Sequence, residues 1–437
     1  MKFLFTFFLL IIALNQTTFP QPLTPDWARN STIYEVNIRQ FTTEGTFKAF
    51  KEHLPRLKEL GVDILWFMPI NPIGELNRKG TLGSYYSVKD YVDINPEFGN
   101  KNDFKILVEE IHKQGMYIIL DWVANHTAWD HEWVKTRPEF YTLDSLGNFV
   151  PPVADWSDVI DLNYVNRELW EEMKSALKYW VQEFNIDGYR CDVAGMVPTE
   201  FWNEVRLELE QIKPVFMLAE WDTPEMHQKA FDMTYDWNLH KLFNQIYSEQ
   251  KNVKDIIQHI KNDQIKYPDY AIRMQFTSNH DENTWNGTEF ERLGDAAELF
   301  AVLTYIVPGM PLIYNGQESG FNKRLEFFEK DLIIWQESKF EDLYRRLNLL
   351  KEKIKALWAG ANAGTTEFIN HNESLIIKRS RDNNEVIGYF NLTNKEIFLD
   401  ISSEKIDNTY NNFETQQPSE IDKYLKLKPW SYKVYYK

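Results

Sequence analysis

The sequence predicts an α/β fold: a (β/α)8 TIM barrel with a short loop domain after its third strand and a C-terminal β-sandwich. From about residue 31, short β-rich runs alternate with helical stretches, a pattern typical of a parallel sheet. Beyond residue 364, short alternating segments follow one another between Asn, Asp and Ser turns. A chain of 437 residues is long enough for both units.

The first 20 residues are predicted to be a signal peptide. Lys2 precedes a mostly apolar run over residues 3–14, and a polar stretch follows over 15–18. The run is too short to remain as a membrane anchor, and it lacks the amphipathic period of a buried helix, which is the alternative interpretation. We therefore expect an exported protein, periplasmic or secreted, with no membrane anchor after signal cleavage.

The catalytic barrel is predicted over residues 21–121 and 167–360. Eight strands are expected at 33–38, 62–68, 116–121, 188–192, 215–220, 231–235, 272–278 and 312–315. Helical periods are expected at 46–60, 102–113, 167–184, 201–212, 239–260, 296–306 and 340–358. Strands and helices that alternate in this order are those of a closed α/β barrel.

Two regions depart from the barrel pattern. Residues 122–166 are rich in Trp, Asp and Pro and contain no convincing helix, so we expect them to form a short loop domain, domain B. Connections of this length are usually functional. Strand-like segments at 374–378, 385–392, 397–401 and 432–436 predict a β-sandwich domain over residues 361–437.

The composition limits the class of ligand. The chain carries 48 Lys and Arg against 65 Asp and Glu, a net charge of −17 that repels polyanions, so we expect no nucleic-acid partner. The single cysteine, Cys191, excludes an intrachain disulfide and a cysteine-based zinc cage. The 15 Trp and 22 Tyr suit a neutral polar ligand with apolar faces, such as a sugar ring.

Four predicted strands end in a carboxylate or in a short cluster that contains one. These acids are Asp121, Asp192, Glu220 and Asp281. Because the C-terminal ends of all barrel strands meet at one mouth, we expect the four side chains to converge there. A single acid of this kind is usually a helix cap or an ion-pair partner, whereas four together indicate an active site.

Two of these acids differ in their neighbours along the chain. Arg190 shares a strand face with Asp192, so we expect its guanidinium to keep Asp192 ionised and nucleophilic. Glu220 lies next to Trp221, in an apolar setting that would raise its pKa toward that of a proton donor. Retaining glycoside hydrolysis requires such a pair. Asp281 would then supply a fixed negative charge for the transition state.

Seven segments resemble the α-amylase superfamily, glycoside hydrolase family 13, and the resemblance covers residues 33–318. The segments are 86–91, 121–126, 161–163, 188–192, the strand that ends at Glu220, 279–281 and 308–318. The residues after Asp192 and the segment 161–163 are similar to those of the neopullulanase and cyclomaltodextrinase branch. The resemblance implies that Asp192 is the nucleophile, Glu220 the acid/base and Asp281 the transition-state stabiliser.

The resemblance also implies which side chains surround the reacting sugar. The expected substrate-binding residues are Tyr86, His126, Arg190, His280 and Trp221. Among these, Trp221 is expected to stack on the leaving sugar. Asp121 and Asp90 are expected to be structural at the site, with Asp121 orienting Arg190.

The calcium site common in this superfamily is incomplete in the sequence. It uses an Asn at the position of Asn125 and a His a few residues beyond the nucleophile, but residues 193–198 contain no His. We therefore expect no required cofactor, with a calcium ion at Asn125 as the alternative.

The expected function is that of an exported retaining glycosidase on an α-glucan substrate. It would cleave α-1,4 bonds, with α-1,6 cleavage as a further activity, in starch, glycogen or maltooligosaccharides. A transglycosylase with the same site is the main alternative, and a non-catalytic glucan-binding relative is disfavoured because all three acids are present. A metal-dependent hydrolase is disfavoured because Arg190 adds a cation where a metal would need anionic or neutral ligands.

Overall fold

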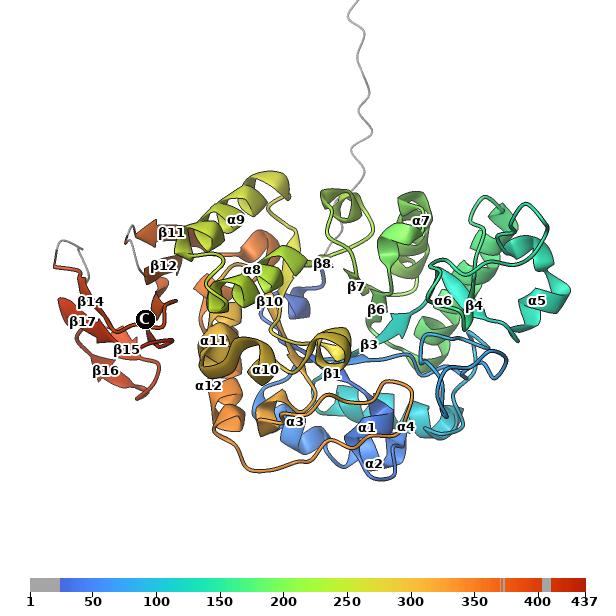
Figure 1. Ribbon diagram of the computed structural model, residues 1–437, viewed down its shortest axis with the longest axis horizontal. Coiled ribbons are helices and arrows are strands. Elements are labelled where there is room, and N and C mark those ends of the chain that lie inside the picture. Colours follow the sequence, from blue (N-terminus) through green and yellow to red (C-terminus); the bar gives the residue numbers. More distant parts are fainter. Residues whose placement is uncertain (1–23, 370, 372–373, 403–409) are drawn as a thin grey trace, which may run out of the picture.

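A closed barrel of eight parallel strands forms the centre of the computed structural model, which describes residues 24–369, 371, 374–402 and 410–437 (Figure 1). The strand order around the barrel is β1-β10-β9-β8-β7-β6-β3-β2. The strands are β1 Ile33–Val36, β2 Ile64–Phe67, β3 Tyr117–Trp122, β6 Gly188–Cys191, β7 Phe216–Ala219, β8 Met233–Tyr235, β9 Ile272–Gln275 and β10 Met310–Tyr314. The predicted barrel is therefore confirmed, whereas the predicted signal peptide lies outside the described residues.

Side chains on each barrel strand alternate between the barrel interior and the surrounding helices. On β2, Trp66 packs in the interior cluster and Phe67 packs in the cluster that faces the helices. On β6, Cys191 joins the same helix-facing cluster, as the strand parity predicts. Arg190 turns inward, and the parallel register holds it opposite Asp121 of β3.

The helices surround the barrel, and several of them differ from the sequence prediction. The helices of the structure are α1 Ile38–Phe41, α2 Phe47–Lys51, α3 Leu54–Leu60, α4 Lys101–Lys113, α5 Glu132–Thr136, α6 Arg167–Phe184, α7 Thr199–Glu210, α8 Trp237–Tyr247, α9 Val253–Lys266, α10 Glu289–Leu293, α11 Ala297–Ile306 and α12 Lys339–Lys353. The first strand ends early because α1 begins at Ile38. The helix predicted over 46–60 is divided, because Pro55 lies in the first turn of a new helix. The helix predicted over 239–260 is divided where Asn252 and Asp255 form a capping box.

The connection after β3 forms a small lobe beside the barrel mouth, at the right of Figure 1. Its strands β4 His126–Ala128 and β5 Val159–Asp161 pair antiparallel. It also contains the helix α5, which the sequence analysis did not predict. This helix has five residues and none of them is buried, so it carries no apolar stripe for a sequence pattern to reveal.

The C-terminal residues form two antiparallel sheets, at the left of Figure 1. The larger sheet has the order β11-β12-β13-β18-β15-β16, and β14 pairs with β17. Their bounds are β11 Thr365–Ile369, β12 Ser374–Arg381, β13 Asn384–Asn391, β14 Ile397–Asp400, β15 Tyr410–Asn412, β16 Gln417–Ser419, β17 Tyr424–Leu427 and β18 Tyr432–Tyr436. Ile376 packs between the two sheets, whereas its neighbour Ile377 belongs to the large core shared with the barrel helices. The β-sandwich is therefore confirmed, and the larger sheet is covered on both faces.

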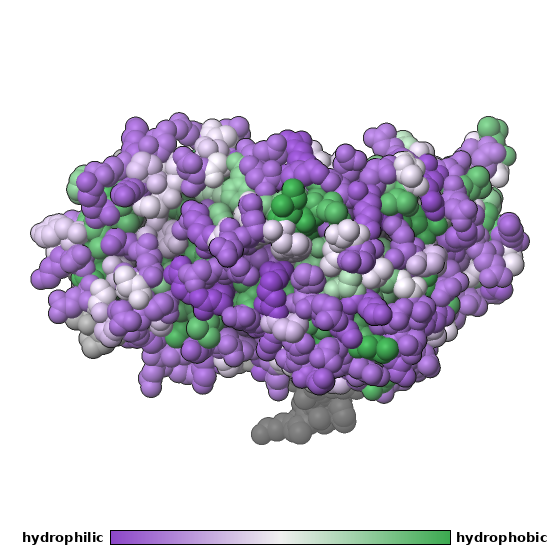
Figure 2. Space-filling view, turned by 90° about the horizontal axis from the view of Figure 1, so that it is seen from below, coloured by the Kyte–Doolittle hydropathy of each residue, from purple (hydrophilic) through white to green (hydrophobic). Residues whose placement is uncertain are grey.

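The surface in Figure 2 is largely hydrophilic, with separate apolar patches. Among the described residues, no helix has both the length and the apolar composition needed to cross a membrane.

Gly188, at the start of β6, is expected to be essential for the close pairing of β6 and β7. Its φ is +151°, and a Cβ there would lie 1.9 Å from the carbonyl oxygen of Phe216. We expect Gly188→Ala to lower the free energy of unfolding by more than about 2 kcal/mol, because backbone strain and overlap add. Urea unfolding measures this loss. The control is Gly115→Ala, where φ is +71° but a Cβ meets nothing within 4 Å. The control should lose only about 1 kcal/mol, and equal losses in the two variants would contradict the explanation.

Candidate active site

A cavity of about 560 Å³ opens at the C-terminal ends of the barrel strands. Its lining includes Tyr86, His126, Asp192, Glu220, His280 and Asp281. Asp192 follows β6, Glu220 follows β7, and Asp281 lies beyond the end of β9. The structure therefore brings together all three predicted catalytic acids and three of the predicted sugar-binding residues.

Arg190 lies beneath this cavity and contacts three carboxylates. Its Nη1 lies 2.9 Å from Asp121 Oδ1 and 3.0 Å from Asp192 Oδ1. Its Nη2 lies 3.0 Å from Glu220 Oε2. The remaining donor, Nε, binds the hydroxyl of Tyr235 at 3.2 Å. Because the Arg190 side chain is fully buried, it is a fixed cation shared by the acids around it.

The two acids at the centre do not differ in the way the sequence analysis predicts. Burial raises the pKa of Asp192 well above its usual value, the Glu220 charge adds to this, and Arg190 only partly opposes it. Burial also raises the pKa of Glu220, and Arg190 again opposes it. The expectation that Arg190 lowers the pKa of Asp192 and so keeps it ionised is therefore wrong, because burial and the Glu220 charge outweigh the guanidinium. Two close carboxyl groups of raised pKa form one coupled pair that retains a proton more readily than an isolated acid.

Val193, directly after Asp192, has a strained backbone. Its φ of +35° is unusual for a β-branched residue. In this conformation its N–H donates to Glu220 Oε2 at 2.8 Å. The strained residue thus orients the Glu220 carboxyl group, and Oε2 receives both this bond and the contact from Arg190.

Tyr86 and His280 form one side of the cavity. Their rings are stacked with centroids 5.4 Å apart, and the Tyr86 hydroxyl lies 2.8 Å from His280 Nε2. The same hydroxyl donates to Asp121 Oδ2 at 3.0 Å, and Trp66 Nε1 donates to that oxygen at 3.1 Å. Asp121 is therefore held below the cavity and contacts Arg190, as the sequence analysis expects of an orienting residue.

His126 also lines the cavity. Burial lowers its pKa to about 4, so the imidazole is neutral at physiological pH. The Trp156 ring lies 5.5 Å from it, and the side-chain amide of Asn125 is 3.3 Å from His126 Nδ1. Asn125 is thus engaged with His126.

Two other predicted site residues lie outside this cavity. Trp221 lines a neighbouring depression of about 390 Å³ together with Val193, Glu220 and Trp237. Its indole packs on Gly195, where an added Cβ would lie 2.0 Å from the ring. Asp90 lies in the loop after β2, and its carboxylate accepts the backbone N–H of Val92 at 2.8 Å. Asp90 therefore shapes that loop and is not among the residues that line the cavity.

Sequence reasoning missed several residues around the cavity. Its rim includes Trp156, Trp285, Phe327 and Phe328, of which Phe327 stacks on Tyr86 at 6.1 Å. Trp156, Phe327 and Phe328 come from loops, and Trp285 lies in a short helical turn over Glu282–Asn286, so no strand end marks these residues. The buried Glu35 of β1 was also missed, although a charged residue at an inward position of a barrel strand is a detectable signal.

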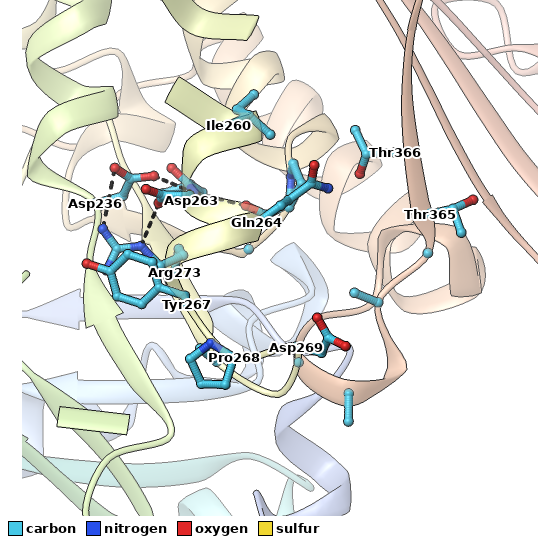
Figure 3. Close-up of a pocket in the computed structure, with 18 of the residues that line it drawn as sticks. Asp236, Ile260, Asp263, Gln264, Tyr267, Pro268, Asp269, Arg273, Thr365 and Thr366 are labelled. Atoms are coloured by element: carbon cyan, nitrogen blue, oxygen red, sulfur yellow. Dashed lines mark hydrogen bonds and ion pairs between the residues drawn. The ribbon is translucent and has the colours of Figure 1, made fainter. Parts of the chain in front are cut away.

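A second cluster of charged residues lies beside α9, away from the catalytic cavity, and Figure 3 shows Asp236 and Asp263 pointing toward Arg273. The ligand atoms of Asp236, His259 and Asp263 lie within 4.8 Å of one another, the one such grouping found in the described part of the chain. Arg273 already supplies positive charge there, 3.0 Å from Asp263 and 3.6 Å from Asp236. The cluster is an ion-pair network that ties α9 to the barrel wall.

Among the described residues, no group of three or more acidic, histidine or cysteine ligands gathers at Asn125. The Nδ2 of Asn125 lies 3.3 Å from His126 Nδ1. In the same lobe, Asp158 forms an ion pair with Lys79 at 3.2 Å. An acid already neutralised by a lysine is a poor partner for a second cation.

Comparisons with known proteins agree with this geometry. The family model described as "Alpha amylase, catalytic domain" matches residues 24–144 and 153–374. Alpha-amylase 2 of Dictyoglomus thermophilum is 26% identical over 422 residues, which cover 86% of this chain and 73% of that protein. A 4-alpha-glucanotransferase of Thermotoga neapolitana is 27% identical over 326 residues, covering 66% of this chain and 71% of that protein.

A solved structure gives a closer likeness. The crystal structure of an alpha-amylase from Lactobacillus plantarum is 32% identical, with a TM-score of 0.85, and covers 94% of this chain and 99% of that one. Since the family model spans the barrel and the structural match spans nearly the whole chain, this protein belongs to the α-amylase family of glycosidases.

Proposed function

We propose that this protein is an exported, retaining α-glucan hydrolase that cleaves α-1,4 bonds of starch, glycogen or maltooligosaccharides, with some cleavage of α-1,6 bonds. The observation that carries the proposal is the sharing of one buried guanidinium by Asp192 and Glu220. The arrangement brings a nucleophile and a proton donor to one cavity, and Asp281 lines the same cavity.

Each acid has one oxygen that the surrounding groups leave for chemistry. Arg190 engages Asp192 Oδ1, so Oδ2 is the oxygen that attacks the anomeric carbon. Arg190 and the Val193 N–H engage Glu220 Oε2, so the acidic proton resides on Oε1. Burial raises the pKa of both acids, so the pair retains a proton, and we assign that proton to Glu220 because its role is to protonate the leaving group.

The reaction then has two steps through a covalent intermediate. Asp192 forms an ester with the sugar while Glu220 protonates the departing glycosidic oxygen. Glu220 next removes a proton from water, which attacks the same carbon and releases Asp192. Asp281 stabilises the positive charge that develops on the sugar ring in both steps.

The aromatic residues support a glucan as substrate. Tyr86, Trp156, Trp285 and Phe327 line the cavity, and a side chain such as Trp285, which is 53% exposed, offers a flat surface to a sugar. Trp221 lines the adjoining depression beside Glu220, where it can stack on the departing sugar. Such stacking contributes about 0.5–1.5 kcal/mol for aromatic pairs.

A transglycosylase is the second candidate. It would use the same intermediate, with a sugar hydroxyl replacing water as the acceptor. The depression lined by Trp221 and Trp237 favours this candidate because it could retain an acceptor sugar. The similarity to a 4-alpha-glucanotransferase points in the same direction. Chromatography of maltotriose digests separates the two, since only transglycosylation forms chains longer than the substrate.

We expect Asp192→Asn and Glu220→Gln each to reduce turnover of soluble starch by roughly 10³ or more, because the two acids act as a unit. Reducing-sugar release measures the rate. Because no step of the proposed mechanism uses a metal, we also expect wild-type activity to persist in a chelator. The matched control is Asp90→Asn, whose carboxylate serves only its own loop and which should keep near wild-type activity. If either catalytic variant retained more than a few per cent of the rate, the assigned roles would be wrong.

The stereochemistry of the first product provides an independent check. A double displacement at the anomeric carbon restores the original configuration, so we expect the α-anomer to form first. Proton NMR of maltopentaose hydrolysis, recorded before mutarotation, identifies the anomer. The β-anomer as first product would exclude a covalent intermediate on Asp192.

Export is proposed from the apolar run over residues 3–14. When the full chain is expressed, we expect the protein outside the cytoplasm with its N-terminus cut near residue 20, as N-terminal sequencing would reveal. Leu10→Arg should block export, because it places a charge in the apolar run, whereas Thr18→Ser, beyond the run, should not. An intact N-terminus on the exported wild-type protein would refute the signal peptide.

A further inference from the structure

His280 is surrounded by acceptors on both of its ring nitrogens. Glu35 Oε1 lies 2.5 Å from Nδ1. On the other side, the Tyr86 hydroxyl oxygen lies 2.8 Å from Nε2 and Asp281 Oδ2 lies 3.4 Å from it. A neutral imidazole carries only one N–H and could donate to one side alone.

The Tyr86 hydroxyl has a single proton, and Asp121 receives it. The distance from this hydroxyl to Asp121 Oδ2 is 3.0 Å, and a buried carboxylate is a stronger acceptor than an imidazole nitrogen. The hydroxyl oxygen therefore accepts a hydrogen bond from His280 Nε2. With Nδ1 donating to an ionised Glu35 as well, the hydrogen bonds correspond to a doubly protonated, positively charged His280.

Glu35 is buried beneath the cavity at an inward position of β1. Without a nearby cation, burial of its ionised carboxylate would cost considerable free energy. The parallel register places it opposite Trp66 of β2 and Tyr314 of β10. Its residue exposure is 0%, and Oε2 makes no hydrogen bond within the described part of the chain. Burial raises the pKa of Glu35, and the close positive charge of His280 is the main influence that opposes this rise.

We propose that Glu35 is a positioning residue that holds His280 as an imidazolium and thereby orients Tyr86 and Asp281 around the reacting sugar. This inference rests on the proposed function, because His280 and Asp281 line the same cavity as Asp192. The imidazolium is a second cation among the clustered acids, and it contacts Asp281, which Arg190 does not reach among its described contacts.

The charges around His280 agree with this assignment. Burial lowers its pKa, but Asp281 and Glu35 outweigh burial and the opposing Arg190 and raise the pKa to about 9. Asp121 of β3 and Glu220, which follows β7, are further acidic groups within electrostatic reach, and Tyr86 and Trp66 are uncharged contacts. Removing the Glu35 charge leaves burial and Arg190 to lower the pKa of His280. The imidazolium is therefore present below about pH 9 in the wild type and should be lost at lower pH in Glu35→Gln.

The direct test is NMR of the full chain labelled with ¹³C and ¹⁵N at histidine, recorded from pH 5 to pH 10. His280→Gln assigns the His280 signals, since it removes only those. In the wild type we expect His280 to remain an imidazolium through pH 8. In Glu35→Gln its titration should move toward acid by roughly 1–3 pH units. A wild-type His280 that is neutral at pH 7 would overturn the proposal, and this measurement does not require Glu35→Gln to fold.

A kinetic readout distinguishes positioning from a purely structural role. The ratio of kcat/KM in Glu35→Gln to that in the wild type should be lowest above pH 7 and should recover several-fold toward pH 5, where His280 regains its proton. The matched control is Glu289→Gln, which changes a buried glutamate that accepts from Gln317 and does not line the cavity. This control should give a ratio that is independent of pH.

The two proposals fail in different ways. If the wild type had no activity on glucans but His280 titrated near pH 9, the proposed function would fail and the role of Glu35 in holding the imidazolium would stand. If glucan activity were present and neither the His280 signals nor the pH-dependent ratio changed in Glu35→Gln, the proposal for Glu35 would be refuted.

Discussion

The buried guanidinium of Arg190 is the interaction on which the barrel mouth depends. Three carboxylates lie within 3.0 Å of its nitrogens, and the side chain is sealed from solvent. Without a cation at this point, the acids would face one another in a region of low dielectric, where like charges repel strongly. A lysine could not replace it, because a single ammonium does not present donors in several fixed directions. Stability and chemistry therefore depend on the same side chain.

Backbone strain next to the nucleophile shows how the barrel directs a carboxyl group. A β-branched residue with φ of +35°, such as Val193, is costly, and sparsely populated conformations of this kind cost about 1–3 kcal/mol. Strands on both sides fix the chain at this point, since β6 pairs with β3 and with β7. The surrounding sheet can hold Val193 in this conformation because the hydrogen bonds and packing of many paired residues offset the strain energy. This conformation directs the backbone N–H of Val193 at Glu220. A backbone donor is held more rigidly than a donor on a flexible side chain would be.

The sequence predicted the parts of this structure that have a period or a fixed place in the fold. Barrel strands were found because apolar runs of their length recur, and Asp192 and Glu220 because catalytic groups gather at strand ends. The contact between Arg190 and Glu220 joins two strands and depends on side-chain reach, which no spacing along the chain encodes. A β-branched residue such as Val193 prefers an extended backbone with negative φ, so sequence-based rules predict that conformation and not the positive φ that the structure shows.

Other differences have local physical causes. The rim aromatic Phe327 lies in a loop whose path is set by tertiary packing. The helix over 46–60 was predicted as one because its apolar period continues across the break, although Pro55 marks a new start. Glu35 could have been found from the alternation along its strand. Ile33 faces the barrel interior, and Tyr34 and Val36 face the helices, so Glu35 must face the interior like Ile33.

The strand order of the C-terminal sheet constrains how this region is assembled. Strand β18 follows every other strand of the sheet in the chain, yet it lies between β13 and β15. The strands β11, β12 and β13 can form local hairpins, and β15 can pair with β16, but the two groups are not joined until residues 432–436 arrive as β18. During synthesis, apolar strand edges therefore stay open after the barrel sequence is complete, and such edges favour intermolecular pairing. A ribosome that stalls before residue 432 would release a chain with a finished barrel and an aggregation-prone tail.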